Sequence, residues 1–190
     1  MKIGVISDTH GVVSAWLGAM KQFEGADLII HAGDVLYHPP RMLNPPGYEL
    51  PELARLMNEC AIPIVVVRGN CDSEVYEELL QTPVQNPYAL VQINQTRIVV
   101  SHGHLFDRDG MIRLGKQFKA DIFISGHTHI PVIDDVGGLI LLNPGSAAFP
   151  KYERNGKPVA SVGIITDDHI QVVSVEDGSV LLEMPLAGIA

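Results

Sequence analysis

The sequence predicts an α/β protein in which two β-sheets pack face to face and helices cover their outer sides. The first half alternates short apolar runs with segments of helical periodicity, the pattern of β-loop-α units. The second half contains apolar runs separated by tight turns, which indicates hairpins. No repeat, low-complexity tract or linker divides the 190 residues, so we expect a single domain over residues 1–190.

The first half contains three predicted strands. Residues 2–7 are a largely apolar run that predicts the first buried strand. The next apolar residues follow the i, i+3, i+4, i+7 spacing of a helix with one buried face: Val13, Trp16, Leu17 and Met20. Residues 27–32 and 62–67 predict the other two strands. Between them, the proline-rich residues 36–50 predict an ordered excursion, and Pro51 suits the first turn of a second helix.

The second half begins with a predicted hairpin, whose arms are residues 91–93 and 97–101. A helix over about residues 109–119 is expected to lead into the apolar run 120–124. Further strands are predicted at residues 132–135, 139–143, 159–166, 170–175 and 180–184. Because tight turns join these runs, we expect most of them to pair in antiparallel fashion.

Composition excludes several classes of protein. The 13 Lys and Arg residues and 22 Asp and Glu residues give a net charge of −9, which disfavours the basic surface that holds duplex nucleic acid. No apolar run approaches the roughly 18 residues of a membrane span. Cys60 and Cys71 are too few for a disulfide framework and fit a reducing compartment. We therefore expect a soluble, cytoplasmic protein without a membrane partner.

Polar clusters stand where the predicted strands end, and layered α/β folds commonly place their clefts there. Seven side chains make up these clusters: Asp8, His10, Asp34, Asn70, His102, His127 and His129. Each residue alone would fit an ordinary turn residue or a hydrogen-bonded core histidine. The recurrence of the same chemical types after successive strands favours a common site.

The chemistry of this set indicates metal ions. Carboxylate and amide oxygens mixed with imidazole nitrogens suit borderline cations such as Mn²⁺, Fe or Zn²⁺ better than a structural zinc site. Seven donors are enough for two ions. Two ions roughly 3.5 to 4 Å apart can hold the attacking and leaving oxygens of a phosphoryl displacement, with a shared carboxylate between them.

The motifs resemble the calcineurin-like metallophosphoesterase superfamily, in particular its small, single-domain bacterial and archaeal phosphodiesterases. Five blocks occur in the order typical of the family: Asp8-Thr9-His10, Gly33-Asp34, Gly69-Asn70-Cys71-Asp72, His102-Gly103 and Gly126-His127-Thr128-His129. Asn143-Pro144-Gly145-Ser146 looks like an additional loop of that branch. The resemblance implies a four-layer αββα sandwich, with two mixed β-sheets flanked by helices.

The resemblance also implies two divalent metal ions per subunit. One ion would be held by Asp8, His10 and His129, and the other by Asn70, His102 and His127, with Asp34 as the bridge. Mn²⁺ is favoured, and Zn²⁺, Fe and Ni²⁺ are the alternatives. The implied reaction is hydrolysis of a small phosphodiester by a hydroxide that the two ions activate. The residues expected to take part in catalysis are Asp34, Asn70, Cys71 and His102.

The sequence departs from the wider superfamily after Gly69-Asn70, where Cys71 replaces the usual histidine. A thiol of normal pKa is mostly neutral at pH 7 and donates a weaker hydrogen bond than imidazolium. Two interpretations of Cys71 stay open: a group beside the leaving oxygen, or a small buried filler.

Other polar residues have predicted roles around this centre. His38 and Arg41 follow the bridging ligand, and together with Asn143 they are predicted to bind substrate. His31 is expected to be a hydrogen-bonded core histidine, and His104 is expected to support the neighbouring ligand.

Alternative functions are a phosphomonoesterase or a dinucleoside polyphosphate hydrolase on the same centre. A third is a non-catalytic protein scaffold, because the retromer subunit has a similar fold. A scaffold would be free to lose metal ligands, and none of the seven is missing here, which favours the enzyme. The sequence leaves the oligomeric state open, and a homodimer and a homotetramer are both compatible with it.

Overall fold

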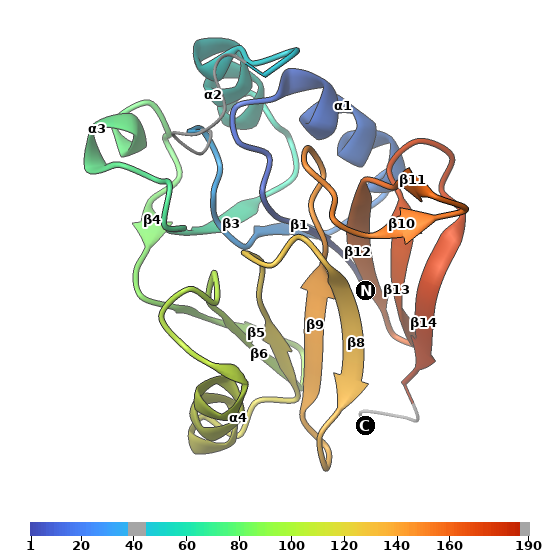
Figure 1. Cartoon of the computed structure of the whole chain (residues 1–190). Helices are drawn as coiled ribbons and strands as arrows, with labels where there is room; N and C mark the ends of the chain where they lie inside the picture. Colours follow the sequence, from blue (N-terminus) through green and yellow to red (C-terminus); the bar gives the residue numbers. More distant parts are fainter. Residues whose placement is uncertain (38–44, 187–190) are drawn as a thin grey trace.

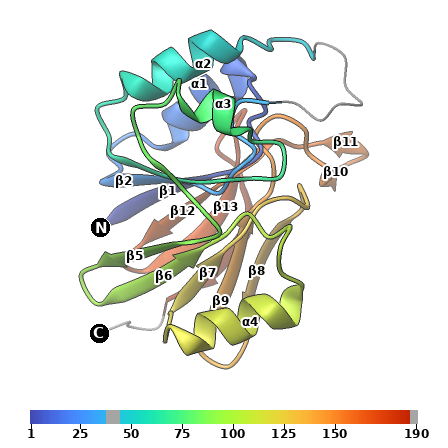
Figure 2. The same cartoon turned by 90° about the vertical axis from the view of Figure 1, so that its left-hand side faces the viewer.

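The protein folds into four layers, in the order helices, sheet, sheet and helix (Figures 1 and 2). The computed structural model describes residues 1–37 and 45–186. Within these residues, the two main sheets contain seven and five strands, and a small hairpin forms a third, two-stranded sheet. The fold class predicted from the sequence is therefore confirmed.

The seven-stranded sheet combines the two ends of the chain. Its strands, in spatial order, are β14 (Val180–Pro185), β13 (His169–Ser174), β12 (Ser161–Thr166), β1 (Lys2–Ile6), β2 (Leu28–His31), β3 (Ile64–Val67) and β4 (Val84–Gln85). Strands β1 to β4 are parallel, whereas β12 pairs with β1 in antiparallel fashion and continues into β13 and β14. The sheet is therefore mixed.

The five-stranded sheet is also mixed. Its strands, in spatial order, are β5 (Ala89–Ile93), β6 (Thr96–Val100), β7 (Ile122–Ile124), β9 (Ile140–Pro144) and β8 (Pro131–Asp135). The three central strands β6, β7 and β9 are parallel, and the two edge strands are antiparallel. The remaining hairpin consists of β10 (Glu153–Arg154) and β11 (Lys157–Pro158).

Hydrophobic side chains fill the space between the layers. Val5 and Ile30 of the first sheet and Ile98, Ile124 and Leu142 of the second belong to one buried cluster between the sheets. Helices α1 (Val13–Gln22), α2 (Leu50–Asn58) and α3 (Glu74–Glu77) lie outside the first sheet, and α4 (Arg108–Gln117) lies outside the second (Figure 2). Burial of these apolar faces is the main force that holds the four layers together.

Some details differ from the prediction. The sequence did not indicate which sheet the last three strands join; β12 to β14 complete the first sheet, in which β12 pairs with β1. The later runs pair mostly in antiparallel fashion, as predicted, in β8 with β9 and in β13 with β12 and β14. Strand β7, for which no pairing was predicted, lies parallel to both of its neighbours, β6 and β9. The short elements α3, β4, β10 and β11 were not predicted, since two to four residues carry no periodic signal. The predicted excursion 36–50 lies partly outside the described residues.

The parallel strands position the site. The carboxyl ends of β1, β2 and β3 lie at the same end of the first sheet, and the loops after β6 and β7 leave the second sheet beside them (Figures 1 and 2). Within the described residues, no helix combines the length and apolar character that crossing a membrane requires.

Candidate metal centre

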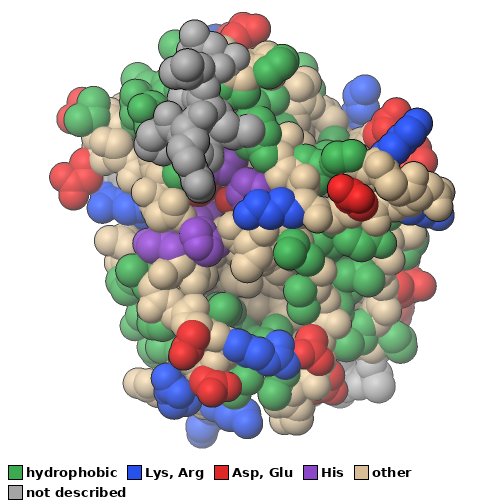
Figure 3. Space-filling model, viewed as in Figure 1, with side chains coloured by type: hydrophobic (Ala, Val, Ile, Leu, Met, Phe, Trp, Pro, Cys, Tyr) green, Lys and Arg blue, Asp and Glu red, His purple; other side chains and the backbone are tan. Residues whose placement is uncertain are grey.

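Loops that follow five parallel strands bring the predicted ligands into one cluster. Asp8 and His10 follow β1, Asp34 follows β2, Asn70 follows β3, His102 follows β6, and His127 and His129 follow β7. Figure 3 shows histidine side chains gathered on one face of the molecule. The structure therefore brings all seven residues to the same end of the two sheets.

The backbone of these loops is strained at the ligand positions. Five of the predicted ligands have positive φ angles: Asp8 (57°), His10 (46°), Asp34 (55°), His127 (67°) and His129 (62°). Residues other than glycine seldom adopt this conformation, which costs on the order of 1 to 3 kcal/mol each and concentrates at functional sites. The surrounding hydrogen bonds hold the strained loops in place.

The first half of the cluster contains Asp8, His10 and His129. The Nδ1 atoms of His10 and His129 donate hydrogen bonds to the carbonyls of Tyr37 (2.8 Å) and Phe149 (2.6 Å). These bonds leave the two Nε2 atoms as lone-pair acceptors in the neutral rings.

The acceptor atoms of this half face one another. Asp8 Oδ1 lies 3.2 Å from His129 Nε2 and 3.6 Å from His10 Nε2, and the two Nε2 atoms are 3.5 Å apart. Asp8 Oδ1 is buried and has no hydrogen-bond partner among the described residues. With both rings neutral, three acceptors face one another, an arrangement that a cation resolves, so this donor set fits a metal ion. Burial lowers the pKa of His129, but Asp8 raises it more, so without a cation a proton on His129 compensates for the carboxylate.

The second half of the cluster is centred on His102. Its Nδ1 donates to the carbonyl of Ala32 (2.7 Å), and its Nε2 lies 3.1 Å from Asn70 Oδ1 and 3.4 Å from Asp34 Oδ2. Asp34 Oδ2 is also 3.8 Å from His10 Nε2, whereas Asp34 Oδ1 accepts from the amide of Cys71 (2.8 Å). One oxygen of Asp34 thus faces both halves of the cluster.

The ionisation states follow from these contacts. Burial lowers the pKa of His102, but the carboxylates of Asp34 and Asp8 raise it more, and the pKa is about 9. Burial raises the pKa of Asp34, but His102 and the Cys71 amide lower it more strongly. Without a metal ion, His102 is therefore an imidazolium beside a carboxylate, and its proton occupies a place that a cation would take.

His127 and Cys71 complete the surroundings. The exposed ring of His127 lies 5.2 Å from the His102 ring, and its backbone amide donates to Asp8 Oδ2 (3.1 Å). The Cys71 sulfur, a His10 ring nitrogen and an Asp34 carboxylate oxygen lie within 4.8 Å of one another, so these three atoms could also hold a metal ion. Burial and Asp34 raise the pKa of the Cys71 thiol to about 12, so in the metal-free protein it stays protonated.

The other predicted residues occupy different surroundings. His31 is fully buried, its Nε2 lies 2.9 Å from the Thr9 hydroxyl and its Nδ1 accepts from the Gly33 amide, in agreement with its predicted core role. The ring of His104 lies 5.4 Å from that of His102, and its buried Nδ1 lacks a hydrogen-bond partner among the described residues. His38 and Arg41 lie outside the described residues.

The position of Asn143 disagrees with its predicted contact to substrate. The side chain is buried, and its Nδ2 donates to the carbonyl of Gly126 (2.7 Å) and to the Thr128 hydroxyl (3.1 Å). Its Oδ1 accepts from the amide of Gly145 (2.9 Å). Because its polar atoms are engaged within the protein, Asn143 holds the loop of His127 and His129.

Ser146 is a site residue that the sequence reasoning missed. Its buried hydroxyl donates to the carbonyl of Asp8 (3.0 Å) and accepts from the amide of Phe149 (2.8 Å). The same short segment that carries Asn143 therefore also braces the loop after β1. The position of Ser146 in the Asn143-Pro144-Gly145-Ser146 motif was the sequence signal that could have identified it as a site residue.

Two glycines allow the ligand loops to approach closely. A Cβ atom at Gly69 would lie 2.0 Å from Asp34 Oδ1, and one at Gly126 would lie 1.9 Å from Ser7 Oγ. Both distances are shorter than any van der Waals contact, so a larger side chain would displace a ligand loop.

Comparisons with known proteins point to one family. The model of the calcineurin-like phosphoesterase superfamily domain matches residues 1–170. The chain is 36% identical to phosphodiesterase YfcE of Escherichia coli K12 over 188 residues, which is 98% of either protein. It is 37% identical to the probable metallophosphoesterase MJ0623 of Methanocaldococcus jannaschii over 158 residues, covering 80% of this chain and 70% of that protein.

Solved structures extend the likeness to the whole fold. The structure of the Escherichia coli phosphoesterase Yfce matches with a TM-score of 0.83 and 34% identity, covering 97% of this chain and 98% of that chain. Vps29 of Entamoeba histolytica, solved in complex with zinc, matches with a TM-score of 0.65 and 25% identity, covering 97% and 99%. Both likenesses therefore include the two sheets and the loops between them.

The raised pKa of His102 leads to a prediction about metal binding. Since His102 must lose its proton to coordinate, binding of Mn²⁺ at pH 7 should release at least about one proton, and affinity should rise with pH, by about tenfold per pH unit for this group, below the pKa of about 9. Calorimetry in two buffers of different ionisation enthalpy measures this release. The His169→Ala variant, altered at the start of β13, should release the same number. Identical heats in both buffers would contradict the prediction.

Proposed function

The chain belongs to the calcineurin-like phosphoesterase superfamily, and we propose that its metal-dependent hydrolysis of phosphodiesters uses two divalent ions in one centre. The assignment to phosphodiester hydrolysis rests on the family match and on the 36% identity to a phosphodiesterase over nearly the whole chain. The observation that carries the proposal of a metal centre is the buried, unpartnered Asp8 Oδ1 facing two imidazole acceptors.

The proposed ligands fall into two sets. Asp8, His10 and His129 would hold one ion, and Asn70, His102 and His127 would hold the other, with Asp34 between them. When bound, such ions lower the pKa of a water nucleophile and neutralise the charge that develops on the phosphoryl group. Support for Asp34 as the bridge comes from its Oδ2, which faces His10 and His102 at 3.8 and 3.4 Å.

Our proposal gives the chain's own residues two tasks. His10, His102 and His129 hold geometry and do not move protons, because a backbone carbonyl fixes the Nδ1 of each ring. Asn70 and His127 are exposed, whereas Asp8 and Asp34 are buried, so substrate approaches from the side of Asn70 and His127. The side-chain amide group of Asn70 is then placed to donate a hydrogen bond to a phosphoryl oxygen.

The remaining expectations concern the setting of the enzyme. We favour a small phosphodiester as substrate and Mn²⁺ as the native ion, with Zn²⁺, Fe and Ni²⁺ as alternatives. A cytoplasmic location is supported by the two cysteines, which are both free thiols. The family match over residues 1–170 supports a single phosphoesterase domain. Assembly into a homodimer or a homotetramer remains a prediction.

Chelation tests the proposed function. Removal of bound metal should abolish hydrolysis of an aryl phosphodiester, and Mn²⁺ should restore it better than Mg²⁺, because the nitrogen-rich donor set suits Mn²⁺ and Mg²⁺ prefers oxygen. Assays with a matched aryl diester and monoester then separate the two esterase activities. Undiminished activity after exhaustive chelation would exclude the mechanism, and two bound ions without any hydrolysis would favour a scaffold.

A comparison of two ligand variants tests the bridge. Asp34→Asn should lower kcat/KM at least roughly tenfold more than His10→Ala, because a bridging carboxylate serves both ions and a terminal ligand serves one. Steady-state kinetics and metal analysis of both variants provide the measurement. Equal losses in two variants that still bind both ions would argue against Asp34 as the bridge.

The raised pKa of Cys71 predicts a weak role in proton transfer. A thiol with a pKa of about 12 is a poor general acid near pH 7, whereas an effective one contributes roughly 10² to 10⁴-fold. Cys71→Ala should therefore change kcat/KM for aryl diesters only a few-fold, and Cys60→Ala serves as the control for loss of a half-buried thiol. Values of kcat/KM for a series of diesters of graded leaving-group pKa, in the wild type and in Cys71→Ala, measure the contribution of the thiol to proton transfer. A loss of about a hundredfold that grows with leaving-group pKa would identify Cys71 as the acid.

A further inference from the structure

Asp72 connects the loops that follow β2 and β3. Its Oδ2 accepts hydrogen bonds from the backbone amides of Asp34 (2.9 Å) and Gly69 (2.8 Å), and its Oδ1 accepts from the amide of Val35 (2.8 Å). Three hydrogen bonds to N–H donors engage both carboxylate oxygens, so Asp72 is occupied within the protein and is not a metal ligand. The carboxylate therefore acts on the backbone that carries Asp34.

The contact between the two loops is reciprocal. Asp34 Oδ1 accepts from the amide of Cys71 (2.8 Å), while Asp72 accepts from the amide of Asp34. Each loop thus supplies one carboxylate to the backbone of the other. The absence of a side chain at Gly69 permits this approach, because a Cβ atom there would lie 2.3 Å from the Asp34 nitrogen.

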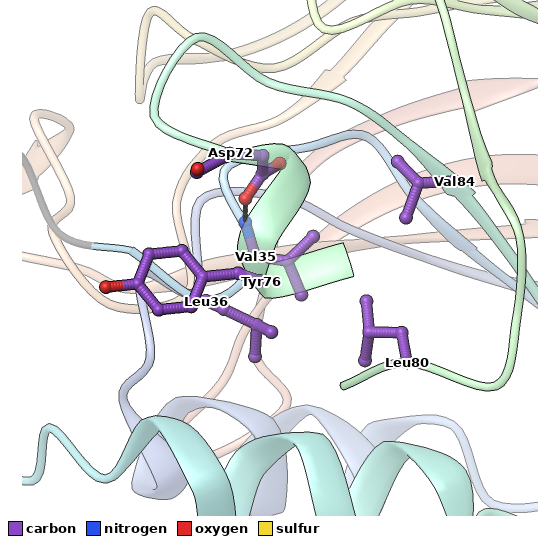
Figure 4. Close-up of a pocket in the computed structure, with 7 residues that line it drawn as sticks. Val35, Leu36, Asp72, Tyr76, Leu80 and Val84 are labelled. Carbon is purple, nitrogen blue, oxygen red and sulfur yellow. Dashed lines mark hydrogen bonds between the residues drawn. The ribbon is translucent and has the colours of Figure 1, made fainter. Parts of the chain in front are cut away.

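The side of Asp72 away from the site is apolar. Figure 4 shows Asp72 hydrogen-bonded to Val35, with Leu36, Tyr76, Leu80 and Val84 around the same cavity. The cavity measures about 10 Å³, at the lower limit of the space that one water molecule needs. Because this side has so little room for water, the hydrogen-bond donors to the carboxylate come from the protein itself.

The contacts explain how Asp34 is held in its strained conformation. Asp34 has a φ of 55°, and its side chain can face both His10 and His102 only while this backbone geometry is maintained. The hydrogen bonds that Asp72 accepts from the amides of Asp34 and Val35 fix the peptide groups on both sides of the Asp34 Cα atom. Hydrogen bonds to a charged acceptor are about twice as strong as neutral ones, which suits this task.

We propose that Asp72 is a positioning residue that holds Asp34 Oδ2 between the two ligand sets and so determines the affinity of the centre for its second ion. The proposal rests on the proposed dinuclear function. Asp72 acts through the backbone of Asp34 and does not touch the substrate. Partners that orient metal ligands typically contribute 10 to 100-fold in metal affinity or activity, so the expected effect is of that size.

The Asp72→Asn variant tests this role. An asparagine retains one acceptor oxygen but directs an N–H₂ group at a backbone amide, so at least one of the three hydrogen bonds is lost. We expect the second Mn²⁺ to bind roughly 10 to 100-fold more weakly while the first binds normally. Hydrolysis should recover toward the wild-type kcat when Mn²⁺ is raised. The exchange-coupled electron paramagnetic resonance signal of a bridged manganese pair should weaken in parallel.

A matched control separates this effect from general loss of a half-buried carboxylate that accepts from a backbone amide. Asp121 accepts from the amide of Arg97 (2.7 Å) at the opposite end of β7, and Asp121→Asn should leave both manganese affinities unchanged. In metal-free wild-type protein, the amides of Asp34, Val35 and Gly69 should exchange slowly with deuterium, a measurement that does not depend on the variant folding.

The outcomes distinguish the two proposals. A wild-type protein that binds fewer than two ions refutes the dinuclear function, and the role of Asp72 falls with it. A wild-type protein that binds two ions, beside a folded Asp72→Asn variant with unchanged affinities, refutes the role of Asp72 alone. Fast exchange of all three amides in the wild type would also overturn it.

Discussion

The burial of negative charge where the two sheets meet is the constraint on which the site depends. Asp8 and Asp34 are almost completely buried, and a buried carboxylate is costly unless hydrogen bonds and opposite charges surround it. Asp34 accepts from the Cys71 amide and lies beside the imidazolium of His102, whereas Asp8 Oδ1 accepts no hydrogen bond among the described residues and lies within 4.0 Å of the Nε2 atoms of His10, His102 and His129. The unused acceptor at Asp8 makes this position attractive to a cation.

The rest of the fold supplies the rigidity that such an arrangement needs. Strained backbone at five ligand positions persists only because the loops are fixed at both ends by buried strands and along their length by hydrogen bonds. Asn143, Ser146 and Asp72 each bind backbone groups of ligand loops instead of facing substrate. The donors are therefore already directed at common points before an ion binds, which reduces the conformational entropy lost on binding.

Local sequence patterns predicted much of this molecule. The apolar runs before Asp8, Asp34 and Asn70 indicated strands, and the polar residues after them indicated a cluster, because both signals lie within a few residues of each other. Contacts between distant segments could not be predicted in this way. The pairing of β12 with β1 joins the two ends of the chain, and the contact of Asp72 with Asp34 joins residues 38 positions apart.

Asn143 illustrates a different limit of sequence reasoning. A polar residue at the end of a strand beside a site suggests a contact with substrate, but the sequence does not give the direction of the side chain. All five residues of β9 are buried, so the amide of Asn143 turns toward a neighbouring loop, where it satisfies backbone groups that burial would otherwise leave unpaired.

The two sheets contribute different members of the proposed ligand set, and this division has a consequence for the protein as a whole. Asp8, His10, Asp34 and Asn70 belong to loops of the first sheet, whereas His102, His127 and His129 belong to loops of the second. An ion held by the proposed ligands from both sides would cross-link the layers, much as a disulfide links the halves of a β-sandwich. Because a metal ion that binds only the folded state shifts the unfolding equilibrium by mass action, the concentration of free metal would then affect the protein's lifetime as well as its turnover.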